Sequence, residues 1–199
     1  MKSKIAIFIC LISVFISGCN RALDKKDYIA WVRDYDNGLH KKVEFQEVIV
    51  DVQYKPIDLL LLTENVALAS DSSQMNKKND FEGMTYFTVK IRHKSNKDIF
   101  KYNLSSESEY YNRLYYFSFG FKDEITLKVG DQTFPCVAYH FEKSYSMSPD
   151  KTFLLGFETD KLADDKNLTL VINDKAFSNH VFEITYTIKE LKSIPKLKL

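Results

Sequence analysis

Alternating hydrophobic and polar positions dominate the chain from residue 85 to residue 188. In the last of these runs, Phe182, Ile184 and Tyr186 alternate with polar neighbours. Such alternation places the apolar side chains of a strand on one face, so each run predicts a strand with one buried face. The other runs of this kind cover 85–91, 115–121, 125–129, 153–157 and 168–172.

Turn signals indicate how these strands connect. Gly130-Asp131 separates the run 125–129 from a second run over 133–141, which predicts a tight hairpin. Pro135 should place the second strand at a sheet edge or a bulge. About eight short strands with few helical crossovers favour a mainly β fold. We therefore expect an antiparallel immunoglobulin-like or related Greek-key β-sandwich with one or two short N-terminal helices, without the Cys, Trp, Cys arrangement of antibody domains.

The N-terminal third carries a different periodicity. Tyr28, Trp31, Val32 and Tyr35 follow helical spacing before Asn37-Gly38, which predicts a helix over 27–36. After Pro56, the apolar stretch 57–69 predicts a second helix, with a buried strand as the alternative.

Between these segments, residues 43–54 alternate but change phase once. We interpret them as one strand with a bulge at Gln46-Glu47. Residues 70–80 are polar throughout and predict a solvated loop.

The first 19 residues have the order of an export signal. Lys2 and Lys4 precede an apolar run over 5–16, which is too short for a transmembrane helix. The run ends at Ile16-Ser17-Gly18-Cys19, which resembles the lipobox of bacterial lipoproteins; an ordinary secretory signal is the alternative. The resemblance implies that residues 1–18 are a signal peptide, that Cys19 is acylated and holds the protein on a membrane, and that 19–26 is a polar tether before a single domain over 27–199.

A second resemblance concerns the family. The stretch from Trp31 to Leu39, together with Gln53-Tyr54-Lys55-Pro56, resembles uncharacterised outer-membrane lipoproteins of Bacteroidota. Asn20, where inner-membrane lipoproteins carry Asp, implies transfer to the outer membrane. The charges of residues 21–27 are mixed rather than acidic, which favours a periplasm-facing position over the cell surface.

The net charge and the cysteine content reduce the number of possible functions. The chain of 199 residues has 28 basic and 27 acidic residues, a net charge of +1, which argues against a nucleic-acid partner. Of the three cysteines, only Cys136 belongs to the domain, so no intramolecular disulfide is expected. Its apolar neighbours predict a small buried hydrophobe rather than a reactive thiol.

Catalytic and metal motifs are missing from the sequence. None of His40, His93, His140 and His180 has a second ligand at a metal-site spacing, and no phosphate-binding loop or nucleophile elbow occurs. We therefore expect no metal, no cofactor and no enzymatic activity. The carboxylates considered for glycosidase chemistry lie at predicted strand ends, where acids are usually solvated: Asp123, Glu124, Glu158, Asp160, Asp164 and Asp165.

Two segments carry candidate contacts. Assigning Tyr115, Phe117, Phe119 and Phe121 to a buried strand face leaves Tyr110, Tyr111 and Tyr116 as a candidate ligand or partner surface. The Lys-rich tail 189–199 is a candidate contact for anionic lipid or a partner, but a frayed, soluble end is the favoured interpretation.

These patterns predict a membrane-anchored lipoprotein that acts as a non-enzymatic binding or accessory subunit of an envelope transport, secretion or surface-assembly complex, with an envelope protein as partner. The alternatives are a glycan-binding or glycan-processing lipoprotein and an immunity or inhibitor lipoprotein. The patterns carry no signal for an oligomeric state.

Overall fold

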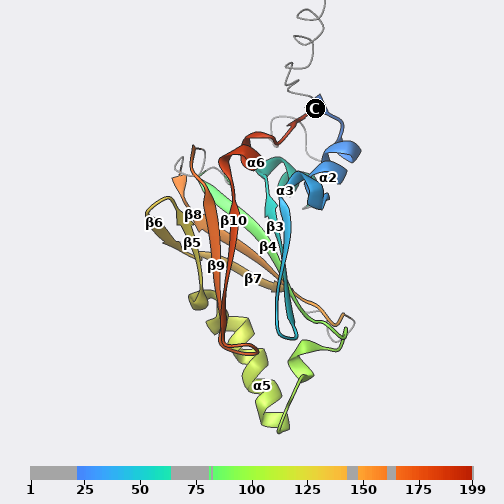
Figure 1. Ribbon diagram of the computed structural model, residues 1–199, viewed down its shortest axis with the longest axis vertical. Coiled ribbons are helices and arrows are strands. Elements are labelled where there is room, and N and C mark those ends of the chain that lie inside the picture. The colour runs from blue at the N-terminus through green and yellow to red at the C-terminus, as the bar shows by residue number, and fades with distance from the viewer. Residues whose placement is uncertain (1–21, 64–80, 82, 143–147, 161–164, 199) are drawn as a thin grey trace, which may run out of the picture.

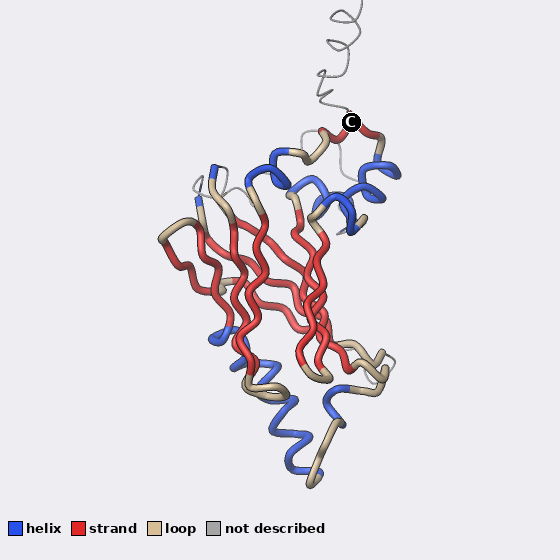
Figure 2. Tube along the Cα trace, viewed as in Figure 1, coloured by secondary structure: helices blue, strands red, loops and turns tan. Residues whose placement is uncertain are grey.

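The computed structural model describes residues 22–63, 81, 83–142, 148–160 and 165–198. Over these described residues the fold is mixed α/β and leans towards β, with 43% strand, antiparallel sheets of five and four strands, and four α-helices. Two sheets occupy the middle of an elongated molecule, with helices at both ends (Figures 1 and 2).

The larger sheet is antiparallel throughout, and its three inner strands have eight to ten residues each. One edge begins with a hairpin and the other ends with a short strand. Its order is β2 (His40–Phe45), β3 (Val48–Lys55), β4 (Met84–His93), β8 (Lys151–Glu158) and β7 (Ala138–Glu142).

The smaller sheet consists of two hairpins joined by an antiparallel pairing of β5 with β9. Gly130, with φ of +58°, allows the tight turn between the strands of the first hairpin. The order is β10 (His180–Tyr186), β9 (Leu168–Asp174), β5 (Ile125–Val129) and β6 (Gln132–Pro135).

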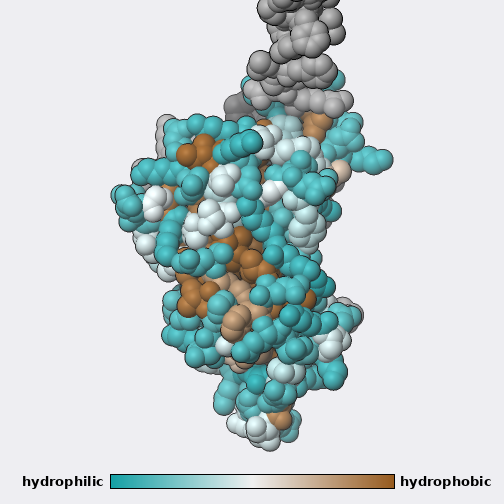
Figure 3. Space-filling model, in the orientation of Figure 1, coloured by the Kyte–Doolittle hydropathy of each residue, from teal (hydrophilic) through white to brown (hydrophobic). Residues whose placement is uncertain are grey.

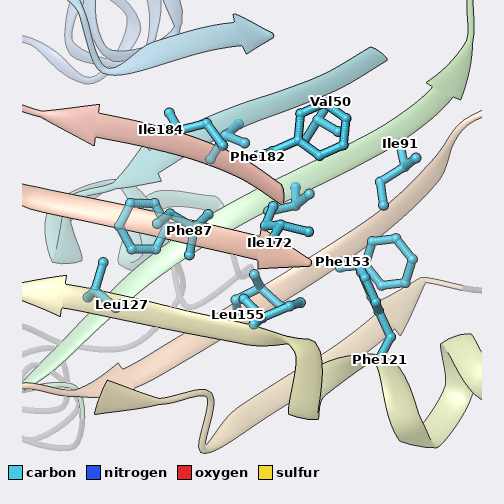
Figure 4. Packing of buried hydrophobic residues seen from close by; sticks show 14 of the residues in the cluster. Val50, Phe87, Ile91, Phe121, Leu127, Phe153, Leu155, Ile172, Phe182 and Ile184 are labelled. Carbon is cyan, nitrogen blue, oxygen red and sulfur yellow. The ribbon is translucent and has the colours of Figure 1, made fainter. Parts of the chain in front are cut away.

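Both sheets bury one face in a common core. Alternate residues of β4 and β8 meet those of β9 and β10, as the side chains in Figure 4 show. Phe87, Phe153 and Ile172 are fully buried there. This packing confirms the predicted strands over 85–91, 125–129, 153–157 and 168–172, and also the last run as far as Tyr186. Ile188 instead begins helix α6 (Ile188–Lys192).

Helix α2 (Lys25–Arg33) confirms the predicted N-terminal helix. The Asp24 carboxylate caps it by accepting a hydrogen bond from the Asp27 amide, and the 3-10 turn η2 (Tyr35–Asn37) follows. Gly38 ends the segment with φ of +77°, the left-handed conformation that glycine adopts readily. Helix α3 (Ile57–Thr63) confirms the start of the second predicted helix. Residues 64–69 of that helix and the predicted loop 70–80 lie outside the described residues.

The predicted bulged strand over 43–54 is wrong. The chain turns at Gln46-Glu47, and β2 and β3 pair back on each other from His40↔Gln53 to Phe45↔Val48. Gln46 takes a left-handed φ of +51°. The phase change that we interpreted as a bulge is the loop of a hairpin.

The predicted strand over 133–141 is also divided. β6 ends at Pro135 and belongs to the smaller sheet, whereas β7 begins at Ala138 and belongs to the larger one. Pro135 lies on an edge strand, as expected, because an edge position does not need its missing amide hydrogen. The chain thus crosses between the two sheets at Cys136-Val137.

The first and last described segments of the chain meet beside α2, at one end of Figure 1. Strand β1 (Ala22–Leu23) pairs in parallel with β11 (Lys196–Leu197), so part of the predicted polar tether is a strand. Leu197 and Ile194 pack against a second hydrophobic cluster around Tyr28. The frayed tail that the sequence favoured is therefore wrong, because its apolar residues are covered.

Candidate functional site

A helical segment at the end of the molecule opposite α2 carries the most exposed aromatic residues (Figure 1). It consists of α5 (Glu107–Tyr115), the π-helix η5 (Tyr116–Gly120) and the 3-10 turn η6 (Phe121–Glu124). The 3-10 turn η4 (Ile99–Lys101) packs beside it. The strand predicted over 115–121 is therefore wrong.

Local interactions explain why this segment is helical. The Ser106 hydroxyl caps α5 by accepting a hydrogen bond from the Glu109 amide, and the Glu109 carboxylate accepts one from the Ser105 amide. Arg113 then forms an ion pair with Glu109 one turn earlier, at 2.7 Å between Nη2 and Oε1. A serine followed three residues later by a glutamate is a helix-start signal, and the sequence analysis missed it.

Residues spaced by four divide this helix into a buried side and an exposed side. Phe117 and Phe121 are fully buried in the core. Tyr111, Tyr115 and Phe119 are 58%, 69% and 61% exposed, and we call these three residues the aromatic stripe. The rings of Tyr115 and Phe119 lie 5.1 Å apart, centroid to centroid. Monomeric proteins rarely expose contiguous large apolar side chains, so the stripe is a candidate contact surface.

The three tyrosines selected from the sequence are only partly in this surface. Tyr111 is exposed, whereas Tyr110 and Tyr116 are half-buried and pack against the core. Burial raises the pKa of Tyr116 to about 12, with Glu124 and Asp174 adding to the shift. Tyr115 and Phe119, which we had assigned to the core, lie in the stripe instead.

The helical segment that carries the aromatic stripe is packed closely against the core. The Tyr139 hydroxyl donates a hydrogen bond to the Phe117 carbonyl oxygen at 2.5 Å, which ties the π-helix to β7. The Phe117 ring stacks against Phe100 and Phe177, at centroid distances of 4.9 and 5.3 Å. A pre-formed surface loses less conformational entropy on binding, so this packing favours recognition by the exposed rings.

A depression of about 290 Å³ lies beside the stripe on the same helix. Its two cations are already engaged: Arg113 donates to the carbonyl oxygens of Phe100 and Tyr102, and Lys175 pairs with Glu124 at 2.6 Å. The depression therefore offers no unpaired charge for a charged substrate. It is lined by Glu109, Asn112, Arg113, Tyr116, Lys175 and Ala176.

A second polar cluster joins η2 to the larger sheet. His40 Nε2 lies 2.5 Å from Asp51 Oδ1, and its Nδ1 lies 3.0 Å from the Arg33 carbonyl oxygen. The Tyr35 hydroxyl donates to the other Asp51 oxygen, and its ring stacks on His40. Since both imidazole nitrogens face protein acceptors, His40 has no nitrogen available to take a proton from a substrate.

His93, His180 and Cys136 pack within the fold, whereas His140 is exposed on β7. His93 is buried and its Nδ1 accepts a hydrogen bond from the Ser95 amide, while His180 stacks on Phe45. Burial raises the pKa of the Cys136 thiol to about 11, which disfavours a reactive thiolate. Among the described residues, no group of three His, Cys, Asp or Glu side chains is arranged to hold a metal ion.

Two of the acidic candidates have structural partners, and Asp123, Glu158 and Asp160 are exposed. Glu124 accepts hydrogen bonds from Asn173 and Lys175, and Asp165 pairs with Lys192 at 2.7 Å. Asp164 and Cys19 lie outside the described residues. In the part of the chain that is described, no helix has the length and apolar character needed to cross a membrane.

Comparison of the chain with protein-family models, with curated proteins and with solved structures finds no match.

Proposed function

We propose that this protein is a lipoprotein acylated at Cys19 and held on the periplasm-facing side of the outer membrane. In this proposal it acts as a non-enzymatic binding or accessory subunit of an envelope complex. The aromatic stripe supports the proposal best, because Tyr111, Tyr115 and Phe119 are exposed together on a rigid helix. Aromatic residues are enriched in the centres of protein interfaces and contribute a large share of their binding energy.

For the topology of the two sheets, we propose an immunoglobulin-like or related Greek-key sandwich. The two antiparallel sheets share one core, and the chain passes from the smaller to the larger between β6 and β7, which supports this description.

Photocrosslinking in native cells tests the partner contact. A photoreactive phenylalanine analogue at position 115 should capture one reproducible envelope protein. The same analogue at Val137, between β6 and β7, and at Val181 in β10, which are 55% and 49% exposed, should not capture that protein. Equal capture from all three positions, or none from position 115, would contradict a contact through the stripe.

A matched pair of variants measures the strength of the contact. The variant Y111A/Y115A/F119A should lower partner recovery at least tenfold, since truncating a central interface aromatic commonly costs about 2 kcal/mol. The control V137A/V181A removes apolar side chains of similar exposure and should leave recovery unchanged. Thermal unfolding of both variants shows whether the fold is intact.

The lipid anchor has its own test. Mass spectrometry of the purified mature protein should find Cys19 at the N-terminus with the added mass of a diacylglyceryl group. A mature N-terminus at another residue, or an unmodified Cys19, would refute lipidation at this position. Neither result depends on whether the stripe binds a partner.

A glycan-binding lipoprotein is the second candidate. The tilted pair Tyr115 and Phe119, with centroids 5.1 Å apart, offers apolar ring faces on which sugar rings can stack. If crosslinking captures no protein, a glycan array should identify a ligand that Y111A/Y115A/F119A no longer binds. An array without signal would remove this candidate.

A further inference from the structure

The pairing of β1 with β11 brings several lysines together near the proposed anchor at Cys19. Ala22 pairs with Lys196 and Leu23 with Leu197, and the Lys198 amide donates a hydrogen bond to the Leu23 carbonyl oxygen at 2.7 Å. Residues 196–198 thereby lie beside the first described residues of the domain.

The alternation of β11 determines which of its side chains face outward. Leu197 packs on the second hydrophobic cluster with Leu23, whereas Lys196 and Lys198 are exposed. Successive side chains of a strand point to opposite faces, so burial of Leu197 turns both lysines away from the protein.

Two more lysines begin the adjacent helix. Lys25 and Lys26 are exposed in the first turn of α2. Positive charges are unfavourable at a helix N-terminus, where the helix dipole is also positive, so the stability of α2 does not account for them. We call Lys25, Lys26, Lys196 and Lys198 the basic collar.

Acidic groups offset this charge only in part. Residues 22–27 and 194–198 contain two acidic side chains, Asp24 and Asp27, and four lysines, so the net charge of these segments is positive. The Asp24 carboxylate caps α2 through the Asp27 amide at 2.9 Å, so it is already oriented towards the helix.

Chain length limits the distance between the collar and the anchor. Three residue steps separate Cys19 from Ala22, and an extended chain spans about 3.5 Å per residue, so the two lie within about 11 Å of each other. The Debye length at physiological ionic strength is about 8 Å, which is comparable with this upper limit. Since Lys196 pairs with Ala22 and lysine side chains are long, the collar charges can reach the headgroups.

We propose that the basic collar binds the anionic headgroups of the membrane that holds the lipid anchor. This inference rests on the proposed acylation of Cys19. Contact at the collar orients the long axis of the molecule so that α5, at the opposite end in Figure 1, points away from the bilayer. Hydrophilic residues cover most of the surface around α2 in Figure 3, as a headgroup contact requires.

The test uses the acylated mature protein in nanodiscs of phosphatidylcholine alone or with added phosphatidylglycerol. An amine-reactive reagent labels exposed lysines, and mass spectrometry measures the labelling rate of each. The collar lysines should react about fivefold more slowly in the anionic nanodiscs, since a lysine near an anionic surface contributes about that factor. Lys101 and Lys122, exposed near α5, should react at the same rate in both.

A salt control and a variant establish the cause. At about 1 M salt, where the Debye length is about 3 Å, the protection should disappear. The variant K25Q/K26Q/K196Q/K198Q should lose the preferred orientation, so that Lys101 and Lys122 become partly protected in anionic nanodiscs. The control K101Q/K122Q should leave protection of the collar unchanged.

The outcomes separate the two proposals. Protein that lacks an acyl group and does not enter nanodiscs refutes the lipid anchor. Protein that enters them but shows equal collar labelling in both lipids refutes the collar and leaves the anchor standing. Protection by inorganic phosphate alone, to the same extent as by the anionic nanodiscs, would also overturn the proposal that a lipid surface is the ligand.

Discussion

His40 and Asp51 are joined at 2.5 Å between Nε2 and Oδ1, across the first hairpin of the larger sheet. The two side chains are largely buried, with exposures of 19% and 12%. Tyr35 and the Arg33 carbonyl oxygen complete the cluster. The Asp51 carboxylate thus connects η2, which follows α2, to the larger sheet through Tyr35 and His40.

Replacing His40 should therefore destabilise the fold. The substitution His40→Ala leaves the buried Asp51 carboxylate with one fewer donor, and we expect the free energy of unfolding to fall by about 2 kcal/mol. Urea denaturation measures this change. His140→Ala, at an exposed position on β7, is the control and should change stability by less than about 0.5 kcal/mol. Equal effects would mean that the His40 contact adds little.

A second buried pair should respond differently to single and double substitution. Lys151 is 5% exposed, and its Nζ lies 2.9 Å from Asp98 Oδ1 and 5.0 Å from the centroid of the Phe100 ring. Lys151→Met removes the cation that faces the Asp98 carboxylate, which would keep its hydrogen bond from the Phe100 amide, and should cost about 3 kcal/mol. The double variant Lys151→Met with Asp98→Asn should recover a large part of that loss. If the loss in the double variant equalled the sum of the losses in Lys151→Met and Asp98→Asn, the two residues would not be coupled.

Gly156 in β8 should not accept a larger side chain. A Cβ atom there would lie 2.9 Å from both the Ala138 Cβ and the Tyr86 Cε1. We expect Gly156→Ala to lower stability by about 2 kcal/mol, because overpacking forces neighbouring atoms to shift. Adding Ala138→Gly removes one of these contacts and should restore part of the loss. Thermal unfolding of the three variants measures both effects.

Alkaline pH should destabilise the protein. Burial, with a hydrogen bond to Asp51, raises the pKa of Tyr35 to about 12, and burial raises that of Tyr116 to the same value. The unfolded chain loses these protons near pH 10, before the folded protein does. Stability is therefore fully present below pH 10 and falls as the pH rises towards about 12.

Urea denaturation at a series of pH values across this range checks the expectation. The variant Tyr35→Phe should show a shallower decline, since its ring cannot ionise. A free energy of unfolding that stays constant above pH 10 would refute the assignment.

The strands were the most predictable part of the fold. Runs such as that ending in Tyr186 bury one face against the other sheet, and a side-chain period of two follows directly from that burial. The predicted bulge at Gln46-Glu47 was wrong because Gln46 takes a left-handed conformation, for which glycine or asparagine is the usual signal.

The aromatic helix shows why the candidate site was only partly predicted. Aromatic residues at 115, 117, 119 and 121 fit both a period of two and a spacing of four. In the helix, spacing by four places Phe117 with Phe121 inside and Tyr115 with Phe119 outside. The Ser106 cap favours the helix, but the alternation of aromatic residues drew the prediction towards a strand before that cap was recognised.

The ordered tail could not be predicted from local pattern. Lys196 and Leu197 form a strand because Ala22 and Leu23 lie beside them, at the other end of the sequence. A two-residue strand has no periodicity of its own, and its partner is set by the three-dimensional fold.

The parallel pairing of β1 with β11 also determines the order in which the domain is completed. During synthesis from the N-terminus, Leu23 emerges among the first residues of the domain, but its partner Leu197 is among the last. The cluster around Tyr28 therefore stays partly uncovered until Ile194 and Leu197 have been synthesised and have packed on it. A chain that ends before Ile194 would leave this side of the cluster exposed to water, so the last step of folding covers residues that were made first.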